Sequence, residues 1–164
     1  MANDAFMKVF GPDLSGESTD VDHKDWIEVM SYSLGMNQPV STASGTGGRS
    51  AGRVGFSDFS VMKQVDKSSL DLMLHCCKGT HFSKVELQVH EASGEKHQFL
   101  IWTLEDVIIS SIQPSGSQGS DKPMESVAFN FGKVKWTYTP LAHDGSAGSK
   151  VGPVGWDLET NKPQ

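Results

Sequence analysis

The side chains best suited to bind a metal ion or to act as a nucleophile lie in one short segment, His75-Cys76-Cys77, which His81 follows closely. Imidazole and thiolate groups are the ligands that zinc prefers. However, the apolar spacing around these residues is helical, and adjacent residues on a helix point about 100° apart. The two thiols therefore cannot converge on one ion, and we predict neither a metal site nor a bound cofactor.

Cys76 and Cys77 are also poor candidates for a catalytic nucleophile. The C-terminal end of a helix carries partial negative charge, which disfavours the reactive thiolate. We expect Cys77 to pack in the core and Cys76 to be half-buried beside it. Because neighbouring cysteines form only strained and rare disulfides, the pair is typical of a chain that folds in a reducing cytoplasm.

The other catalytic motifs are incomplete. His90-Glu91 lacks the second histidine of a zinc-protease helix. The glycine run at 45–52 has neither the G-K-[ST] ending of a phosphate loop nor the G-x-G-x-x-G of a dinucleotide site. Acidic residues occur singly or in a loose cluster, so no pair for glycoside hydrolysis stands out. We predict no catalytic residue; an uncharacterised hydrolase is an alternative that would need a cleft gathering perturbed acids, bases or thiols.

Length and charge limit the classes of protein to which the chain can belong. Its 164 residues are enough for a single domain, 1–164, with a proper core. The net charge of −6 argues against nucleic-acid binding, which needs a surplus of Lys and Arg. The first ten residues lack the pattern of a signal peptide or a membrane-spanning helix. We expect a cytoplasmic protein with no nucleic-acid partner and no membrane insertion.

Most of the chain alternates polar and apolar residues, which is the period of half-buried β-strands. Val85, Leu87 and Val89 face one side, whereas residues 97–104 are apolar on both sides. Together with the other alternating segments, this pattern predicts a mainly β fold, an antiparallel β-barrel of about seven or eight strands. A small-ligand-binding β-barrel is a second alternative, and it would need a roomy and mostly apolar interior.

One segment has helical spacing instead. Leu70, Met73, Leu74 and Cys77 recur at i, i+3, i+4 and i+7, and Gly79 follows as a C-terminal stop. Because this apolar stripe is narrow, we predict one α-helix that flanks the barrel and turns the stripe toward it.

The segment 125–139 changes its parity. Its apolar residues begin on odd positions, such as Val127, and resume on even ones from Val134. A slip of one residue sends every later side chain to the other face of the sheet unless an extra residue absorbs it. Gly132 lies between the two sets, and we predict a β-bulge there.

The run 38–52 is rich in Gly, Ser and Thr and has almost no apolar side chain to anchor it on its own domain. Ordering a residue costs about 1–2 kcal/mol of backbone entropy, and glycine loses the most. We therefore expect an extended arm that becomes ordered when it docks on a partner.

The chain resembles the haemolysin-coregulated protein (Hcp) family of type VI secretion over nearly its whole length. Several segments carry this resemblance at once, which makes it more specific than any short motif. They are D-A-F-M-K-V at 4–9, Trp26–Gly35 with Gln38-Pro39, the arm with Arg49–Arg53, Phe59–Ser69, Leu72–Cys76 before Gly79-Thr80-His81, Glu125–Tyr138 and Gly155-Trp156.

This resemblance implies a barrel subunit like those of phage tail tubes, without catalytic activity. Such subunits close into hexameric rings, and the rings stack into a hollow tube. The tube lies inside a contractile sheath, carries a spike protein at its tip, and is expelled from the cell without a signal peptide. Its lumen carries or chaperones small effector proteins.

Two groups of candidate residues follow from the arm and from the resemblance. The residues predicted to contact a neighbouring subunit or ring are Ser44, Gly45, Thr46, Gly47, Gly48, Arg49 and Arg53. The small polar residues predicted near the wall of the lumen are Ser110, Ser111, Ser115 and Ser117, for which an ordinary solvated turn is the alternative.

Overall fold

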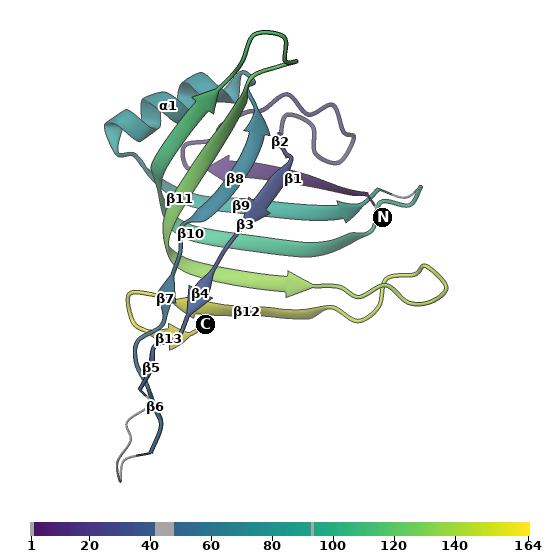
Figure 1. The fold of residues 1–164 in the computed structure, drawn as a ribbon. Coiled ribbons are helices and arrows are strands. Elements are labelled where there is room, and N and C mark those ends of the chain that lie inside the picture. Colours follow the sequence, from purple (N-terminus) through teal and green to yellow (C-terminus); the bar gives the residue numbers. More distant parts are fainter. Residues whose placement is uncertain (1, 42–47, 93) are drawn as a thin grey trace.

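The computed structural model describes residues 2–41, 48–92 and 94–164. This part of the chain contains thirteen strands and one helix, α1 (Ser68–Lys78) (Figure 1). The strands are β1 (Asn3–Phe10), β2 (Ile27–Val29), β3 (Ser31–Ser33), β4 (Met36–Asn37), β5 (Val40–Ser41), β6 (Ser50–Ala51), β7 (Gly55–Phe56), β8 (Phe59–Gln64), β9 (His81–Glu91), β10 (Gln98–Ser115), β11 (Met124–Tyr138), β12 (Val151–Asp157) and β13 (Lys162–Pro163).

Nine of the described strands form one antiparallel sheet, and the other four form two short ribbons. The strand order along the main path is β13-β12-β11-β10-β9-β1-β2, while β8 pairs with both β11 and β3. The long strands β10 and β11 curve and carry the sheet around on itself (Figure 1). β11 pairs with β8 through 124–129 and with β12 through 133–138, so it belongs to both halves of the sheet.

The structure confirms a mainly β chain with antiparallel pairing, and it corrects the predicted barrel. The described strands form no closed barrel, because β2 pairs with β1, β3 pairs with β8, and Met30 separates the two. The chain bends at Met30, which donates its backbone N–H to the carbonyl of Met62 at 2.8 Å. The described part has thirteen strands instead of seven or eight. Strands of two residues, such as β4 and β13, are too short to show a period in the sequence.

The predicted change of parity in β11 is present, but Gly132 is not a β-bulge. Phe131 and Val134 are both buried, although the register of β11 on β10 is unbroken between them. The opposing strand has a residue with left-handed backbone there, Asp106 with φ 51°. A Cβ atom on residue 132 would lie 3.2 Å from Oδ2 of Asp106. The two strands therefore bend together, and glycine leaves room for the Asp106 side chain.

A β-bulge lies instead at Ser110 in β10. The register of β10 on β11 shifts by one residue between Ile109 and Ser111. The hydroxyl of Ser110 donates to Oδ2 of Asp58 at 2.6 Å, and the backbone carbonyl of Ala128 lies 3.2 Å from it. A short polar side chain can thus bond within the bulge, and this feature has no apolar signature that the sequence analysis could detect.

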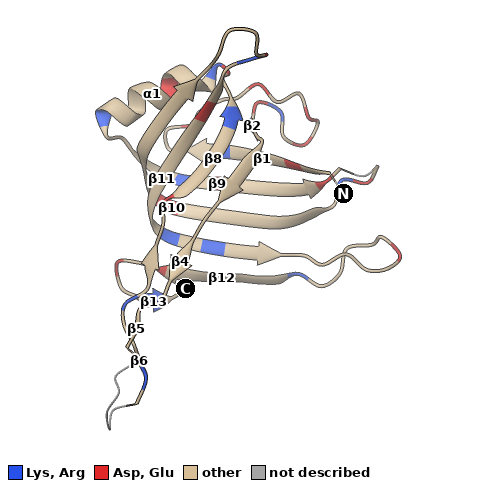
Figure 2. Ribbon diagram, viewed as in Figure 1, with Lys and Arg blue, Asp and Glu red and all other residues tan. Residues whose placement is uncertain are grey.

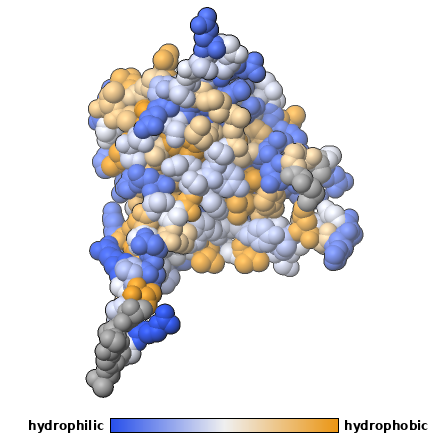
Figure 3. Space-filling view, in the orientation of Figure 1, coloured by the Kyte–Doolittle hydropathy of each residue, from blue (hydrophilic) through white to orange (hydrophobic). Residues whose placement is uncertain are grey.

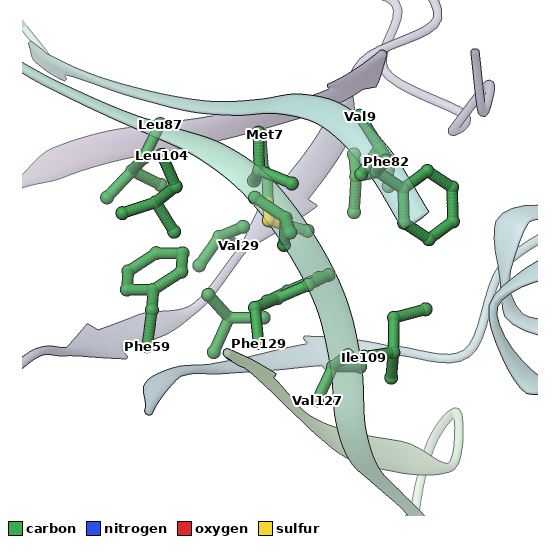
Figure 4. Packing of buried hydrophobic residues seen from close by; sticks show 14 of the residues in the cluster. Met7, Val9, Val29, Phe59, Phe82, Leu87, Leu104, Ile109, Val127 and Phe129 are labelled. Atoms are coloured by element: carbon green, nitrogen blue, oxygen red, sulfur yellow. The ribbon is translucent and has the colours of Figure 1, made fainter. Parts of the chain in front are cut away.

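The hydrophobic core lies between the two halves of the sheet. Side chains from strands far apart in the sequence meet there, among them Phe59, Phe82 and Phe129, none of which is more than 1% exposed (Figure 4). The rings of Phe59 and Phe129 are stacked with centroids 6.1 Å apart. The interior is filled by the chain's own side chains, so the fold does not favour a roomy ligand-binding barrel.

Helix α1 presents a different face to the core than its apolar spacing predicted. Cys76 is half-buried as expected, but Cys77, which was expected in the core, is exposed. Leu72, outside the predicted stripe, is fully buried, whereas Leu70 is 74% exposed. The inward face begins with the buried polar residue Ser69. The apolar spacing alone therefore predicted the wrong face of α1 as the buried one. The predicted stop at Gly79 is confirmed, with φ 63°.

A buried ion pair joins β8, β11 and the first turn of α1. Lys63 and Glu125 are 0% and 1% exposed, and Lys63 Nζ donates to Oε1 of Glu125. Lys63 Nζ also donates to Oδ1 of Asp66 at 3.0 Å and to Oγ of Ser69 at 3.1 Å. The Ser69 hydroxyl donates to the same Glu125 oxygen at 2.6 Å. The first turn of α1 is thus positioned by charged side chains rather than by apolar packing.

Candidate functional site

The predicted arm is a narrow ribbon that extends away from the sheet (Figure 1). Its base is the pair β4 and β7, and β5 pairs with β6 further out. Met36 is 53% exposed and Val40 is 47% exposed. Of the predicted arm residues, Ser44, Gly45, Thr46 and Gly47 lie outside the described residues. The described part of the arm therefore leaves apolar side chains open to a partner.

The remaining predicted arm residues occupy two different environments. Gly48 and Arg49, which directly precede β6, are exposed. Arg53 instead donates from Nη2 to the backbone carbonyl of Leu158 at 2.5 Å. Arg53 thus ties the base of the arm to the turn between β12 and β13 of its own domain.

The turn that receives Arg53 is itself fixed by a carboxylate. Oδ1 of Asp157 accepts the backbone N–H groups of Glu159 and Thr160 at 2.9 and 3.1 Å. The bond from Thr160 is the main reason that the pKa of Asp157 lies below its usual range. The carboxylate is therefore ionised at neutral pH and holds the carbonyl that anchors the arm.

An open apolar groove lies where the arm meets the sheet, and we name it the base groove. Its volume is about 490 Å³. The side chains of Phe56 and Trp136 lie nearly parallel there, with ring centroids 6.4 Å apart. The residues that form most of its apolar wall are Met36, Phe56, Trp136, Val154, Trp156 and Pro163. No local pattern in the sequence predicts this groove, because five separate strands contribute to it.

The outer edge of β12 continues this apolar surface. β13 and the following Gln164 cover β12 at 155–157, so this pairing does not reach residues 151–154. Val151 and Val154 are 56% and 59% exposed. Apolar atoms are visible along the lower edge of the molecule, where β12 lies, and on the arm (Figures 1 and 3). Val151 and Val154 are three positions apart, and the register of β12 on β11 shifts between them, so no regular alternation in the sequence marks this surface.

The predicted lumen residues do not form one cluster. Ser110 and Ser111 lie within β10, whereas Ser115 ends this strand and Ser117 follows it in the turn. All four are exposed. The hydroxyl of Ser115 lies 3.4 Å from the carbonyl of Met124. Their exposure is compatible with a tube wall and with an ordinary turn.

The residues with potential metal or catalytic chemistry are bound to separate partners. Nδ1 of His75 lies 2.8 Å from the Thr80 hydroxyl, while Nδ1 of His81 lies 3.3 Å from Oδ1 of Asp106. In the described ranges, no group of three or more His, Cys, Asp or Glu side chains is arranged to hold a metal ion. Charges of both signs are interspersed over the ribbon (Figure 2). The helix in the described part of the chain is too short to cross a membrane.

Comparison with known proteins gives consistent matches. The family described as "Type VI secretion system effector, Hcp" matches residues 6–138. The chain is 40% identical over 162 residues to protein hcp1 of Pseudomonas aeruginosa, and the match covers 98% of each chain. A solved structure of a type six secretion system protein superposes with a TM-score of 0.94 at 38% identity, covering 99% of this chain and 100% of that one. Hcp1 from Salmonella typhimurium superposes with a TM-score of 0.78 at 29% identity over 100% of both chains.

Proposed function

Because this chain belongs to the Hcp family of type VI secretion tube proteins, we propose that it is a structural subunit of such a tube. In this proposal, copies pair head to tail and close into a hexameric ring, and rings stack into a hollow tube. The tube acts mechanically and has no catalytic role.

The observation that carries the proposal is the arm together with the base groove. A ribbon with Met36 and Val40 exposed buries little of its own apolar surface. The base groove and the outer edge of β12 offer apolar surface of the kind that a second copy would cover. A specific interface buries roughly 1,600 Å² in total, which is more than a single short ribbon supplies. We therefore assign the arm and the β12 edge to one extended contact between copies.

The proposed partners follow from the tube. They are further copies of the chain, a contractile sheath around the tube, a spike protein at its tip and small effector proteins in the lumen. The chain assembles in the cytoplasm and leaves the cell by the type VI route without a signal peptide. Ser110, Ser111, Ser115 and Ser117 are proposed to face the lumen, because all four are small, polar and exposed.

The direct test is the oligomeric state of the purified chain. Negative-stain microscopy should show annular particles with six-fold symmetry, and light scattering should give a mass of a hexamer or of stacked hexamers. A monomer that persists from micromolar to near-millimolar concentration would contradict the proposal.

Deleting residues 44–50 should weaken the stacking of rings without unfolding the domain. The core residues lie in the sheet, and the described part of the arm adds few buried side chains to it. Circular dichroism should therefore give an unchanged spectrum and melting temperature, while microscopy should show single rings in place of tubes. If the deletion variant is unfolded, the arm packs on its own domain and is not an assembly element.

A further inference from the structure

Two buried histidines hold the segment 15–26 against the sheet, far from the arm. His23 lies in this segment and is 3% exposed, while His90 lies on β9 and is 7% exposed. Their Nε2 atoms are 3.0 Å apart. The rings lie at an interplanar angle of 68°, and the ring of Phe6 stacks on His23 with centroids 4.5 Å apart. No step of the proposed tube function uses this pair.

Both ring nitrogens of His23 face hydrogen-bond acceptors. Nδ1 lies 3.0 Å from Oδ1 of Asp20, and Nε2 lies 2.8 Å from Oε1 of Gln88. The amide of Gln88 is oriented by its own NH₂ group, which donates to Oε1 of Glu86. A carboxylate oxygen and an amide oxygen can only accept, so both bonds of His23 are made when each of its nitrogens carries a proton.

The protonation state of His90 follows from these two bonds of His23. Nε2 of His23 carries a single proton, which Oε1 of Gln88 and Nε2 of His90 share, so Nε2 of His90 acts as an acceptor and His90 is neutral. If His90 also took up a proton at Nε2, two N–H groups and two positive charges would face each other at this distance. We propose that the pair carries one proton beyond those of two neutral imidazoles, held on His23, and that a further proton, taken up by His90 at acid pH, separates the rings and releases residues 15–26 from β1 and β9.

Charged groups of both signs surround the pair. Asp20 and Asp22 face it from the segment itself, Asp4 from β1 and Glu86 from β9. Lys96, in the turn between β9 and β10, forms an ion pair with Asp20. Lys96 therefore neutralises part of the negative charge that could otherwise stabilise a second proton on the pair.

The direction of the pKa shift agrees with the geometry. Burial, and then the charge of His23, lower the pKa of His90, while a hydrogen bond to the Lys96 backbone and the carboxylates of Asp22 and Asp4 partly oppose this. An unfolded histidine titrates near about 6.5. Neutral His90 therefore contributes its full stabilisation above that pH, and the contribution is lost as the pH falls from there toward the lower pKa of the folded state.

Hydrogen exchange measured by mass spectrometry tests the proposal. The protection of a peptide covering residues 15–26, corrected for the intrinsic pH dependence of exchange, should fall by about tenfold or more between about pH 7.5 and about pH 5, which corresponds to one pKa unit. Peptides from the paired region of β9 and β10 should keep their protection. In His90→Gln, whose side chain does not titrate, the pH dependence of the 15–26 peptide should disappear.

The matched control is His143→Gln, which changes an exposed histidine in the turn before β12 and should behave as the wild type does. Constant protection of the 15–26 peptide in the wild type, or an equal loss in His90→Gln, would overturn the proposal. If His90→Gln does not fold, imidazole resonances of the wild type decide, since the proposal requires the two rings to take up their protons in separate steps. Addition of Zn²⁺ at neutral pH is a further test. A strong increase in the protection of the 15–26 peptide that His90→Gln abolishes would overturn the proposal and identify a metal site instead.

Discussion

Replacing Lys63 by methionine should lower the free energy of unfolding by about 3–5 kcal/mol, because it leaves a buried carboxylate without its cation. Glu125 is 1% exposed, and its Oε2 atom already has no hydrogen-bond partner in the described part of the chain. The substitution would also remove the bonds that Lys63 Nζ makes to Asp66 and Ser69 at the start of α1. Urea unfolding followed by circular dichroism measures the change.

Two comparisons separate the buried charge from general effects of losing a lysine. Lys135→Met removes a partly exposed pair, in which Nζ lies 3.5 Å from Oε1 of Glu105, and should change stability by less than about 1 kcal/mol. The double variant Lys63→Met with Glu125→Leu should recover most of the loss, because apolar residues of similar volume can replace a buried pair. Equal destabilisation by Lys63→Met and Lys135→Met would show that burial of the pair is not the cause.

The ion pair explains why apolar periodicity did not predict every buried residue of the sheet. Lys63 and Glu125 occupy positions that continue the buried parity of their strands, and they are directly paired in the register of β8 on β11. The alternation correctly identified the strands themselves. The alternation did not predict that the polar residues Lys63 and Glu125 are buried, because apolar periodicity identifies a buried face only where the buried residues are apolar. The wrong face of α1 has the same cause, since Ser69 begins its inward stripe.

The candidate site was predictable only in part. The composition of the run 38–52 predicted an arm, and the structure has an extended ribbon at β4 to β7. The base groove could not be predicted, because Met36 and Val154 come together only through the pairing of distant strands. The pair of His23 and His90 was missed for the same reason, since 67 positions separate the two residues.

Replacing Val154 by lysine should weaken self-association by about 100-fold or more without reducing the stability of the isolated domain. Val154 is 59% exposed on β12 and lines the base groove, so the substitution removes almost no core packing. If a second copy covers this surface, the ammonium group must be buried without a partner, and each tenfold loss of affinity corresponds to about 1.4 kcal/mol. Sedimentation velocity over a range of concentrations measures the loss of assembly, and urea unfolding should change by no more than about 0.5 kcal/mol.

Val21→Lys is the matched control, because it makes the same change at a residue that is 93% exposed in the segment 15–26. It adds the same charge far from the base groove, so a general effect of net charge on assembly would appear in both variants. The proposal requires that only Val154→Lys dissociates the assembly. If only Val21→Lys dissociates the assembly, the contact between copies lies at the end of the sheet that carries β1 and β2. The apolar surface around β12 would then need a different partner.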